Sequence, residues 1–145
     1  MKVVLQRVSR ASVTVESNIV GSIDNGYVIL FGVSEGDDKS KAEKMVGKIQ
    51  KLRIFPDENG KTNLSIDDVG GGILVVSQFT LYADCKKGNR PSFVTVADPV
   101  LAEKLYNYFI ENAKGKFSKV EHGIFGESMK VELVNDGPFT VILED

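Results

Sequence analysis

The opening third of the chain alternates apolar segments with turn-forming residues, and this pattern requires a β-sheet. Residues 3–8 and 11–16 are predicted strands, and the second alternates valine with polar residues. Asn25-Gly26 is a typical turn dipeptide and lies between two further apolar segments, 19–23 and 27–33. This arrangement predicts a β-hairpin, because Asn-Gly fits the tight turns that join antiparallel strands. The first third is therefore expected to form an antiparallel meander.

Two later segments carry helix signals. Asp37 and Asp38 can cap a helix whose apolar residues recur at steps of three and four, at Ala42, Met45, Val46, Ile49 and Leu52. Asp98-Pro99 predicts the start of a second helix, because an N-cap residue precedes a proline at the first helical position. This helix is expected to run to about Ala113 and to bury Leu101, Leu105, Tyr108 and Phe109.

The remaining strands complete one domain. They are predicted at residues 73–76, 129–134 and 139–143, the last two joined by a turn at 135–138. No internal repeat, low-complexity tract or linker divides the chain, so residues 1–145 are predicted to form a single domain. The order of the elements predicts an α+β fold, a mainly antiparallel sheet with two main helices on one face.

Composition narrows the cellular setting. Cys85 is the only cysteine and cannot form an internal disulfide, which indicates a reducing compartment. The first residues lack the apolar run of a signal peptide, and no apolar stretch approaches the roughly 20 residues that span a bilayer. A cytoplasmic protein is expected. The net charge of −2 argues against a protein that coats nucleic acid, although it permits a catalyst that meets RNA briefly at one site.

Several common catalytic classes are disfavoured by what the chain lacks. A Ser-His-Asp or Cys-His arrangement needs a histidine base, and the only histidine, His122, lies beside a glycine turn and is best explained as a surface residue. One histidine and one cysteine cannot build a His/Cys metal site, so no metal is predicted. Gly70-Gly71-Gly72 lacks the spacing of a phosphate-binding or dinucleotide-binding loop, so no cofactor is predicted either.

Three polar segments remain as candidates. Ser77-Gln78-Phe79-Thr80 follows directly on the buried strand 73–76, where a bend can aim backbone N–H groups into a cavity. Residues 135–140, Asn-Asp-Gly-Pro-Phe-Thr, are taken from composition alone as a hairpin turn with a trans proline. The third segment is a basic loop that includes Lys86, Lys87 and Arg90, and it is either solvated or a contact for an anionic ligand.

Together these segments resemble the D-aminoacyl-tRNA deacylase family. Ser77-Gln78-Phe79-Thr80 is similar to the family's Ser-Gln-x-Thr signature, and residues 135–140 are similar to its Asn-x-Gly-Pro-x-Thr signature. Supporting stretches occur in order along the whole chain, at residues 6–8, 10–13, 53–55 and 90–93 and at Gly88 and Phe125. Two motifs at this separation are far more specific than either one alone.

The resemblance implies a homodimer that closes into a barrel-like body, with an active site at each subunit boundary. In the family, a cis Gly-Pro peptide of one subunit reaches into the site of the other. Carried over, the carbonyls of Gly137 and Pro138 would face the α-carbon of the substrate, oriented by Arg7. An L side chain would clash there, whereas a D side chain points elsewhere and glycine has none.

The implied reaction is hydrolysis of the ester that joins a D-amino acid to the terminal adenosine of tRNA, a proofreading step of translation. Backbone N–H groups of Phe79 and Thr80 would stabilise the oxyanion, and Ser77 and Gln78 would bind the adenosine. The ribose hydroxyl of the substrate would position the water. The alternative, attack by the Thr80 hydroxyl, is less favoured because no base lies beside it in the sequence.

The basic loop is the expected contact with RNA. Lys86, Lys87 and Arg90 would meet the acceptor end of tRNA. One alternative is a non-catalytic RNA-binding or assembly module with the same fold, and another is a hydrolase of other small D-amino esters. Glycyl-tRNA is a possible further substrate.

Overall fold

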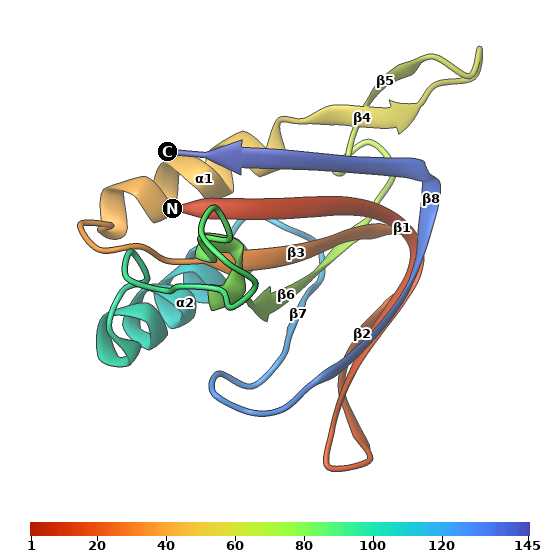
Figure 1. Ribbon diagram of the computed structural model, residues 1–145. Helices are drawn as coiled ribbons and strands as arrows, with labels where there is room; N and C mark the ends of the chain where they lie inside the picture. The colour runs from red at the N-terminus through yellow and green to blue at the C-terminus, as the bar shows by residue number, and fades with distance from the viewer.

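One long strand organises the sheet. The computed structural model describes residues 1–145, and in it β1 (Lys2–Val15) is hydrogen-bonded along both of its edges. One edge pairs with β3 (Gly26–Gly32) over residues 2–8 and with β2 (Asn18–Ile23) over residues 11–15. The other edge pairs with β8 (Lys130–Glu144) over almost its whole length. Figure 1 shows β1 and β8 lying side by side in opposite directions and bending together.

The hairpin expected at Asn25-Gly26 is wrong. β2 and β3 do not pair with each other, but follow one another along the same edge of β1. The tight turn lies instead at Glu16 and Ser17, whose φ angles of 47° and 69° are those of a two-residue hairpin turn with positive φ at both positions. Asn25-Gly26 only bends the returning strand. The turn was missed because Glu-Ser lacks the glycine or asparagine that this conformation favours.

The rest of the sheet is parallel, so the sheet is mixed. β6 (Gly72–Ser77) runs parallel to β3, and β7 (Val120–His122) runs parallel to β6. The prediction of a mainly antiparallel sheet holds for the pairs made by β1. β4 (Arg53–Pro56) and β5 (Thr62–Ser65) form a separate antiparallel pair that projects from the body (Figure 1).

The two predicted helices are confirmed, and both lie on one side of the sheet (Figure 1). α1 (Lys39–Gln50) is capped by Asp38, whose side chain accepts from the Lys41 N–H. α2 (Pro99–Lys114) is capped by Asp98 and begins with Pro99. Burying their apolar faces against the sheet forms the main core of 25 residues, which includes Phe31, Met45, Ile49 and Phe109.

A second, smaller core lies on the other face of the sheet. It contains Val8, Ala11, Val13, Ile23, Val28, Leu74 and Val76. The curl of the sheet covers these side chains, because β2 approaches β7 so closely that a Cβ on Gly21 would lie 3.0 Å from the His122 carbonyl oxygen. The sheet is therefore nearly closed and barrel-like. None of the helices has both the length and the apolar character of a membrane-spanning segment.

A buried ion pair ties the beginning of β1 to the segment before α1. The α-ammonium of Met1 donates to Asp37 Oδ1 (2.7 Å), and both groups are fully buried. Ser34 N–H and Lys41 Nζ donate to the same carboxylate, at 2.8 and 3.0 Å. Burial opposes ionisation of Asp37, but these donors outweigh it and hold the pKa below its usual value.

Replacing Asp37 with asparagine is expected to lower the free energy of unfolding by about 3 kcal/mol at pH 7, because the partner cation stays buried without its counter-ion. A carboxyl whose pKa is lowered by folding stabilises the fold at pH values above its pKa in the unfolded state, which is about 4. That contribution is lost as the pH falls through the native pKa, so the difference between wild type and Asp37→Asn should shrink in acid. Urea unfolding between pH 7 and pH 3 measures it.

The neighbouring Asp38→Asn variant is the control, because asparagine also caps helices well. It should change stability by less than about 0.5 kcal/mol. A difference between wild type and Asp37→Asn that stays constant down to pH 3 would contradict the ionic account.

Candidate active site

The Ser-Gln-Phe-Thr segment lies where β6 ends. Gln78 N–H still bonds to the Phe31 carbonyl (2.8 Å), and a single 3-10 turn, η1 (Phe79–Tyr82), then leads the chain away from the sheet. The first bond of this turn runs from Leu81 N–H to the Gln78 carbonyl. The N–H groups of Phe79 and Thr80 precede that bond and have no partner within the turn. This geometry leaves two adjacent backbone donors available for an oxyanion.

The Thr80 hydroxyl is held by its own motif. Gln78 Nε2 donates to Thr80 Oγ1, which fixes the threonine side chain beside the turn. The structure gives Thr80 no hydrogen bond to a carboxylate or a histidine, the groups that activate a hydroxyl nucleophile. The arrangement favours the backbone of this turn over the Thr80 hydroxyl as its chemically useful part.

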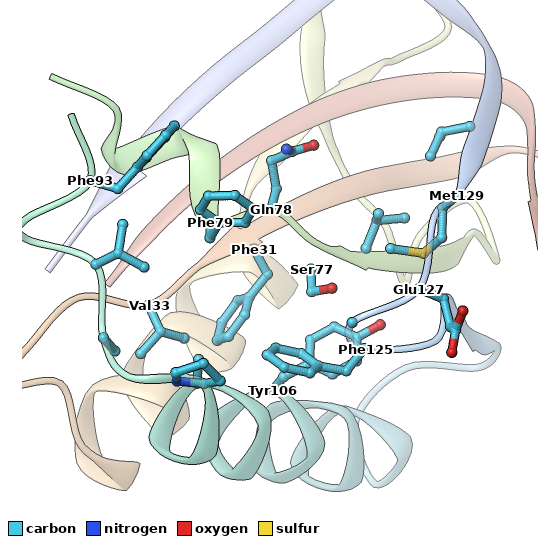
Figure 2. A pocket seen from close by; sticks show the side chains of 17 residues that line it. Phe31, Val33, Ser77, Gln78, Phe79, Phe93, Tyr106, Phe125, Glu127 and Met129 are labelled. Carbon is cyan, nitrogen blue, oxygen red and sulfur yellow. The ribbon is translucent and has the colours of Figure 1, made fainter. Parts of the chain in front are cut away.

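A pocket of about 650 Å³ opens beside the motif (Figure 2). Its volume lies within the range of roughly 300–1,000 Å³ that is typical of small-molecule sites. Twelve of its 17 lining residues are hydrophobic, and Ser77, Gln78 and Glu127 bring side-chain oxygen or nitrogen atoms. An apolar cavity with a few polar groups suits a small organic ligand that carries a few hydrogen-bonding groups.

Part of the pocket was not predicted from the sequence. α2 and the segment before β8 contribute Ala102, Tyr106, Phe125, Gly126, Glu127 and Met129. The buried stripe of α2 comprises Ala102, Leu105, Tyr106, Phe109, Ile110 and Ala113, which confirms Leu105 and Phe109 and adds Tyr106. The predicted Leu101 and Tyr108 are only partly buried against the core. The small residue Ala102 could have signalled this face, because it extends the three- and four-residue steps through Leu105 and Phe109.

Tyr106 connects the floor of the pocket to two strands. Its hydroxyl donates to the carbonyl oxygens of Val75 (3.0 Å) and Gly123 (3.1 Å), and the ring is almost fully buried. Burial raises the pKa of Tyr106 above its ordinary value, so the phenol stays neutral. The residue therefore acts as a fixed part of the wall.

The second motif is a bulge in a continuous strand, and the predicted hairpin turn with a trans proline is wrong. Thr140 pairs with Gln6 and Asn135 pairs with Val8, so residues 136–139 all face the single residue Arg7. These four residues, the Gly-Pro bulge, leave the β8 ladder, and the Gly137-Pro138 peptide bond is cis. The sequence could not show this locally, because the two halves of β8 pair with β1 and not with each other.

Arg7 holds the base of the Gly-Pro bulge. Its Nε donates to the Asp136 carbonyl (2.9 Å), and its Nη1 donates to the Ile54 carbonyl (2.5 Å). The guanidinium also lies 4.9 Å from the centre of the Phe139 ring. Arg7 thus holds the carbonyl that directly precedes Gly137, and this buried cation fixes the Gly-Pro bulge at its base.

The outer residues of the motif close the bulge. Asn135 Oδ1 accepts from the Phe139 N–H (2.8 Å), and Asn135 Nδ2 donates to Thr140 Oγ1 (2.9 Å). Gly137 has a φ of +136°, which L residues rarely adopt, and a Cβ there would lie 2.8 Å from Arg7 Nη2. The bulge therefore needs Asn135 and Thr140 for these hydrogen bonds and Gly137 for its backbone conformation. Gly137 and Pro138 themselves are exposed and project from the sheet.

The structure does not bring the two motifs together within one chain. Ser77 pairs with Phe31 of β3, and Phe31 pairs with Val3 of β1. The Gly-Pro bulge lies opposite Arg7, four residues further along β1. The two sites are also separated by the strands β1 and β3. At about 3.3 Å per residue and 4.8 Å per strand, the motifs lie roughly 20 Å apart.

The basic residues lie on an exposed loop after η1. Paired backbone bonds between Asp84 and Ser92 (2.8 and 2.9 Å) close residues 85–91 into a basic hairpin loop. Lys86, Lys87 and Arg90 are exposed on it, as is Cys85. His122 lies outside the pocket lining, with Nδ1 2.8 Å from the Gly123 carbonyl oxygen. No three His, Cys, Asp or Glu side chains are grouped so as to hold a metal ion.

Residues 4–144 match the family model described as D-Tyr-tRNA(Tyr) deacylase. Proteins named D-aminoacyl-tRNA deacylase from Koribacter versatilis and Aeromonas hydrophila are 54% and 53% identical to this chain over 144 residues, covering 99% of it and 97% and 99% of themselves. These matches confirm the family expected from the two motifs.

Solved structures agree with this. The structure named c-Myc DNA unwinding element binding protein superposes with a TM-score of 0.94 at 42% identity, over 100% of this chain and 99% of that one. A probable eukaryotic D-amino acid tRNA deacylase has a TM-score of 0.84 at 18% identity, over 98% and 97% of the two chains, and shows the shared fold. Because the family model matches residues 4–144, nearly the whole chain, this chain belongs to the D-Tyr-tRNA(Tyr) deacylase family.

Proposed function

We propose that this protein hydrolyses the ester of D-aminoacyl-tRNA in the cytoplasm, releasing the free D-amino acid and tRNA as a proofreading step of translation. One observation carries the proposal: an apolar pocket of about 650 Å³ opens beside the free N–H groups at the start of η1. A terminal adenosine in this pocket brings the ester on its ribose next to Phe79 and Thr80. No metal or cofactor enters the scheme.

The chemistry then needs little beyond positioning. Ser77 and Gln78 hydrogen-bond the adenosine, and the N–H groups of Phe79 and Thr80 stabilise the oxyanion that forms when water attacks the ester carbonyl. The neighbouring ribose hydroxyl orients that water. The carbonyl carbon gains a bond to the water oxygen and loses its bond to the ribose oxygen, which takes up a proton. The absence of a base beside Thr80 is consistent with this scheme.

The proposal includes a homodimer with its active sites at the subunit boundary. Within one chain the Gly-Pro bulge lies roughly 20 Å from the Ser77-Gln78-Phe79-Thr80 segment, too far for both to touch one aminoacyl group. Gly137 and Pro138 are exposed and project from the sheet, so a second copy can receive them. In a two-fold pair each copy would give its bulge to the other's pocket and complete a barrel-like body.

Selection of the D enantiomer would follow from the bulge. The Gly137 and Pro138 carbonyls of one copy face the substrate's α-carbon in the other, where they exclude an L side chain by contact. Arg7 and Asn135 keep these carbonyls in place through the Asp136 carbonyl and the Phe139 N–H. Glycine, which has no side chain, passes the same filter, so glycyl-tRNA charged on the wrong tRNA is a further substrate in this scheme.

A nucleic-acid-binding module is the second candidate, because the solved structure at 42% identity is named as a DNA unwinding element binding protein. Such a module needs no stereochemical filter. The proposed site predicts both turnover and chirality, so the enzyme assays below separate the two functions.

Wild-type protein is expected to release D-tyrosine from D-tyrosyl-tRNA at least about a hundredfold faster than L-tyrosine from L-tyrosyl-tRNA. The reason is steric: a clash between the L side chain and the backbone carbonyls keeps the L ester out of its reactive position. Release of labelled amino acid at limiting enzyme measures both rates. Binding without release of either ester would favour the nucleic-acid-binding module, and equal release of both would remove the filter. Release from simple D-tyrosine esters at the same rate would make tRNA incidental.

Gly137→Ala is expected to reduce the ratio of D to L rates by about tenfold or more, equivalent to about 1.4 kcal/mol of lost discrimination. The added Cβ would lie 2.8 Å from Arg7 Nη2 at a φ that alanine rarely adopts, so the carbonyls of the bulge must move. Gly60→Ala is the control, because Gly60 also has a positive φ (+73°) but nothing within 4 Å of an added Cβ. An unchanged ratio in Gly137→Ala would exclude the bulge as the filter.

Ala102→Phe is expected to lower kcat/KM for D-tyrosyl-tRNA by at least about tenfold, because the new ring would enter the space assigned to the adenosine. Glu103→Phe places the same ring on the exposed side of the same turn and should retain activity. Thermal unfolding of both variants checks that the fold persists. Full activity of a folded Ala102→Phe protein would place the adenosine elsewhere.

A further inference from the structure

Two exposed aromatic rings form one edge of the pocket. Phe79 and Phe93 lie edge to face, with ring centres 5.1 Å apart and planes at 62°. Both line the pocket, yet 55% of Phe79 and 39% of Phe93 remain exposed to solvent. Figure 2 shows Phe93 beside Phe79 and across the pocket from Phe125, Glu127 and Met129. We call this pair the aromatic shelf.

Positive charge lies next to the aromatic shelf. Phe93 directly follows Ser92, the residue that closes the basic hairpin loop against Asp84. The exposed cations on that loop are Lys86, Lys87 and Arg90. A single segment between η1 and α2 therefore carries Phe93, a ring that lines the pocket, directly after the loop that bears the three exposed cations.

Exposed aromatic rings near cations are typical of surfaces that bind single-stranded nucleic acid. Bases stack on aromatic faces, while Lys and Arg meet the linking phosphates. The acceptor end of tRNA is single-stranded beyond its stem, so the base that precedes the terminal adenosine is free to stack. With the adenosine inside the pocket, that base emerges at its mouth.

We infer that the aromatic shelf stacks the nucleobase preceding the terminal adenosine, while Lys86, Lys87 and Arg90 meet the phosphates on either side of it. This rests on the proposed function, and it adds a second nucleotide subsite outside the adenosine pocket. Recognition by stacking tolerates any base, so the subsite contributes affinity for an RNA end and no sequence preference.

Charge favours this occupant over a second copy of the chain. In the proposed homodimer the second copy meets the pocket with its Gly-Pro bulge, so the shelf would contact a second shelf only if the two-fold axis passed through it. The three cations of each basic hairpin loop would then lie close to those of the other copy. A polyanion removes that repulsion and neutralises the loop. The shelf is therefore assigned to RNA and not to the dimer contact.

The test compares substrates that differ by one nucleotide. D-tyrosyl esters of adenosine, of the dinucleotide cytidylyl-adenosine and of full tRNA are hydrolysed by wild type and by Phe93→Ala. In wild type the dinucleotide should exceed adenosine in kcat/KM by about tenfold, and Phe93→Ala should bring this ratio close to one, in line with the loss of one base stack. Any effect of Phe93→Ala on the pocket itself acts on both substrates and cancels in the ratio.

Matched variants keep the result specific. Phe93→Tyr keeps an aromatic face and should restore the dinucleotide-to-adenosine ratio, and Val94→Ala, at an 85% exposed neighbour, should leave it unchanged. A ratio that survives in Phe93→Ala overturns the inference, as does a loss that depends on the amino acid and not on the added nucleotide. A lower molecular mass of Phe93→Ala in solution would assign the shelf to a second copy and also overturn it.

A binding measurement separates this inference from the proposed function. Uncharged cytidylyl-adenosine should bind wild type about tenfold more tightly than adenosine, and Phe93→Ala should lose that difference, whether or not any ester is hydrolysed. Wild type that binds in this way but releases no D-amino acid would refute the hydrolase and keep the shelf. Wild type that hydrolyses D-tyrosyl-tRNA but binds both ligands equally would refute the shelf and keep the hydrolase.

Discussion

The two-sided pairing of β1 is the constraint on which the rest of the structure depends. Its hydrogen bonds to β2 and β3 on one edge and to β8 on the other join the two ends of the chain. The sheet can curl around the small core only because β1 bends between its two halves, and β8 follows that bend with the Gly-Pro bulge opposite Arg7. The feature assigned to stereochemical selection is thus also the place where the sheet changes direction.

Arg7 shows how the fold and the site share one interaction. Its guanidinium is buried, and it donates to carbonyls of two separate segments, at Ile54 and Asp136. A buried cation is costly unless its donors are satisfied, so these bonds hold both segments in one arrangement. In the proposed enzyme, Arg7 does not touch the substrate; its hydrogen bonds fix the position of the Gly137 and Pro138 carbonyls that do.

The pocket and the basic hairpin loop assign separate tasks to neighbouring segments. β6 and η1 supply rigid backbone donors, α2 and the segment before β8 supply apolar walls, and the loop after η1 supplies charge. A protein with a net charge of −2 can act on RNA if some of its cations are gathered on one loop next in sequence to the site, as Lys86, Lys87 and Arg90 are. This placement reconciles the overall acidity with an RNA substrate.

The sequence by itself determined the elements whose signals are local. Asp38 and Asp98 cap the helices as predicted, because a cap depends only on residues within one turn, and the two motifs identified the family because their residue order is read without the fold. Most of the apolar segments are strands for the same reason. The α+β class, both helices and most of the strands were therefore predictable from the sequence.

Only the tertiary structure decided how those elements pair. The turn at Glu16-Ser17, the parallel addition of β6 and β7, and the single strand β8 in place of a hairpin all depend on register between residues far apart in the chain. The inward turn of Tyr106, and the meeting of Phe79 with Phe93, depend on the same packing. Local propensity cannot specify these contacts, because they arise when separate segments share one core and one curved sheet.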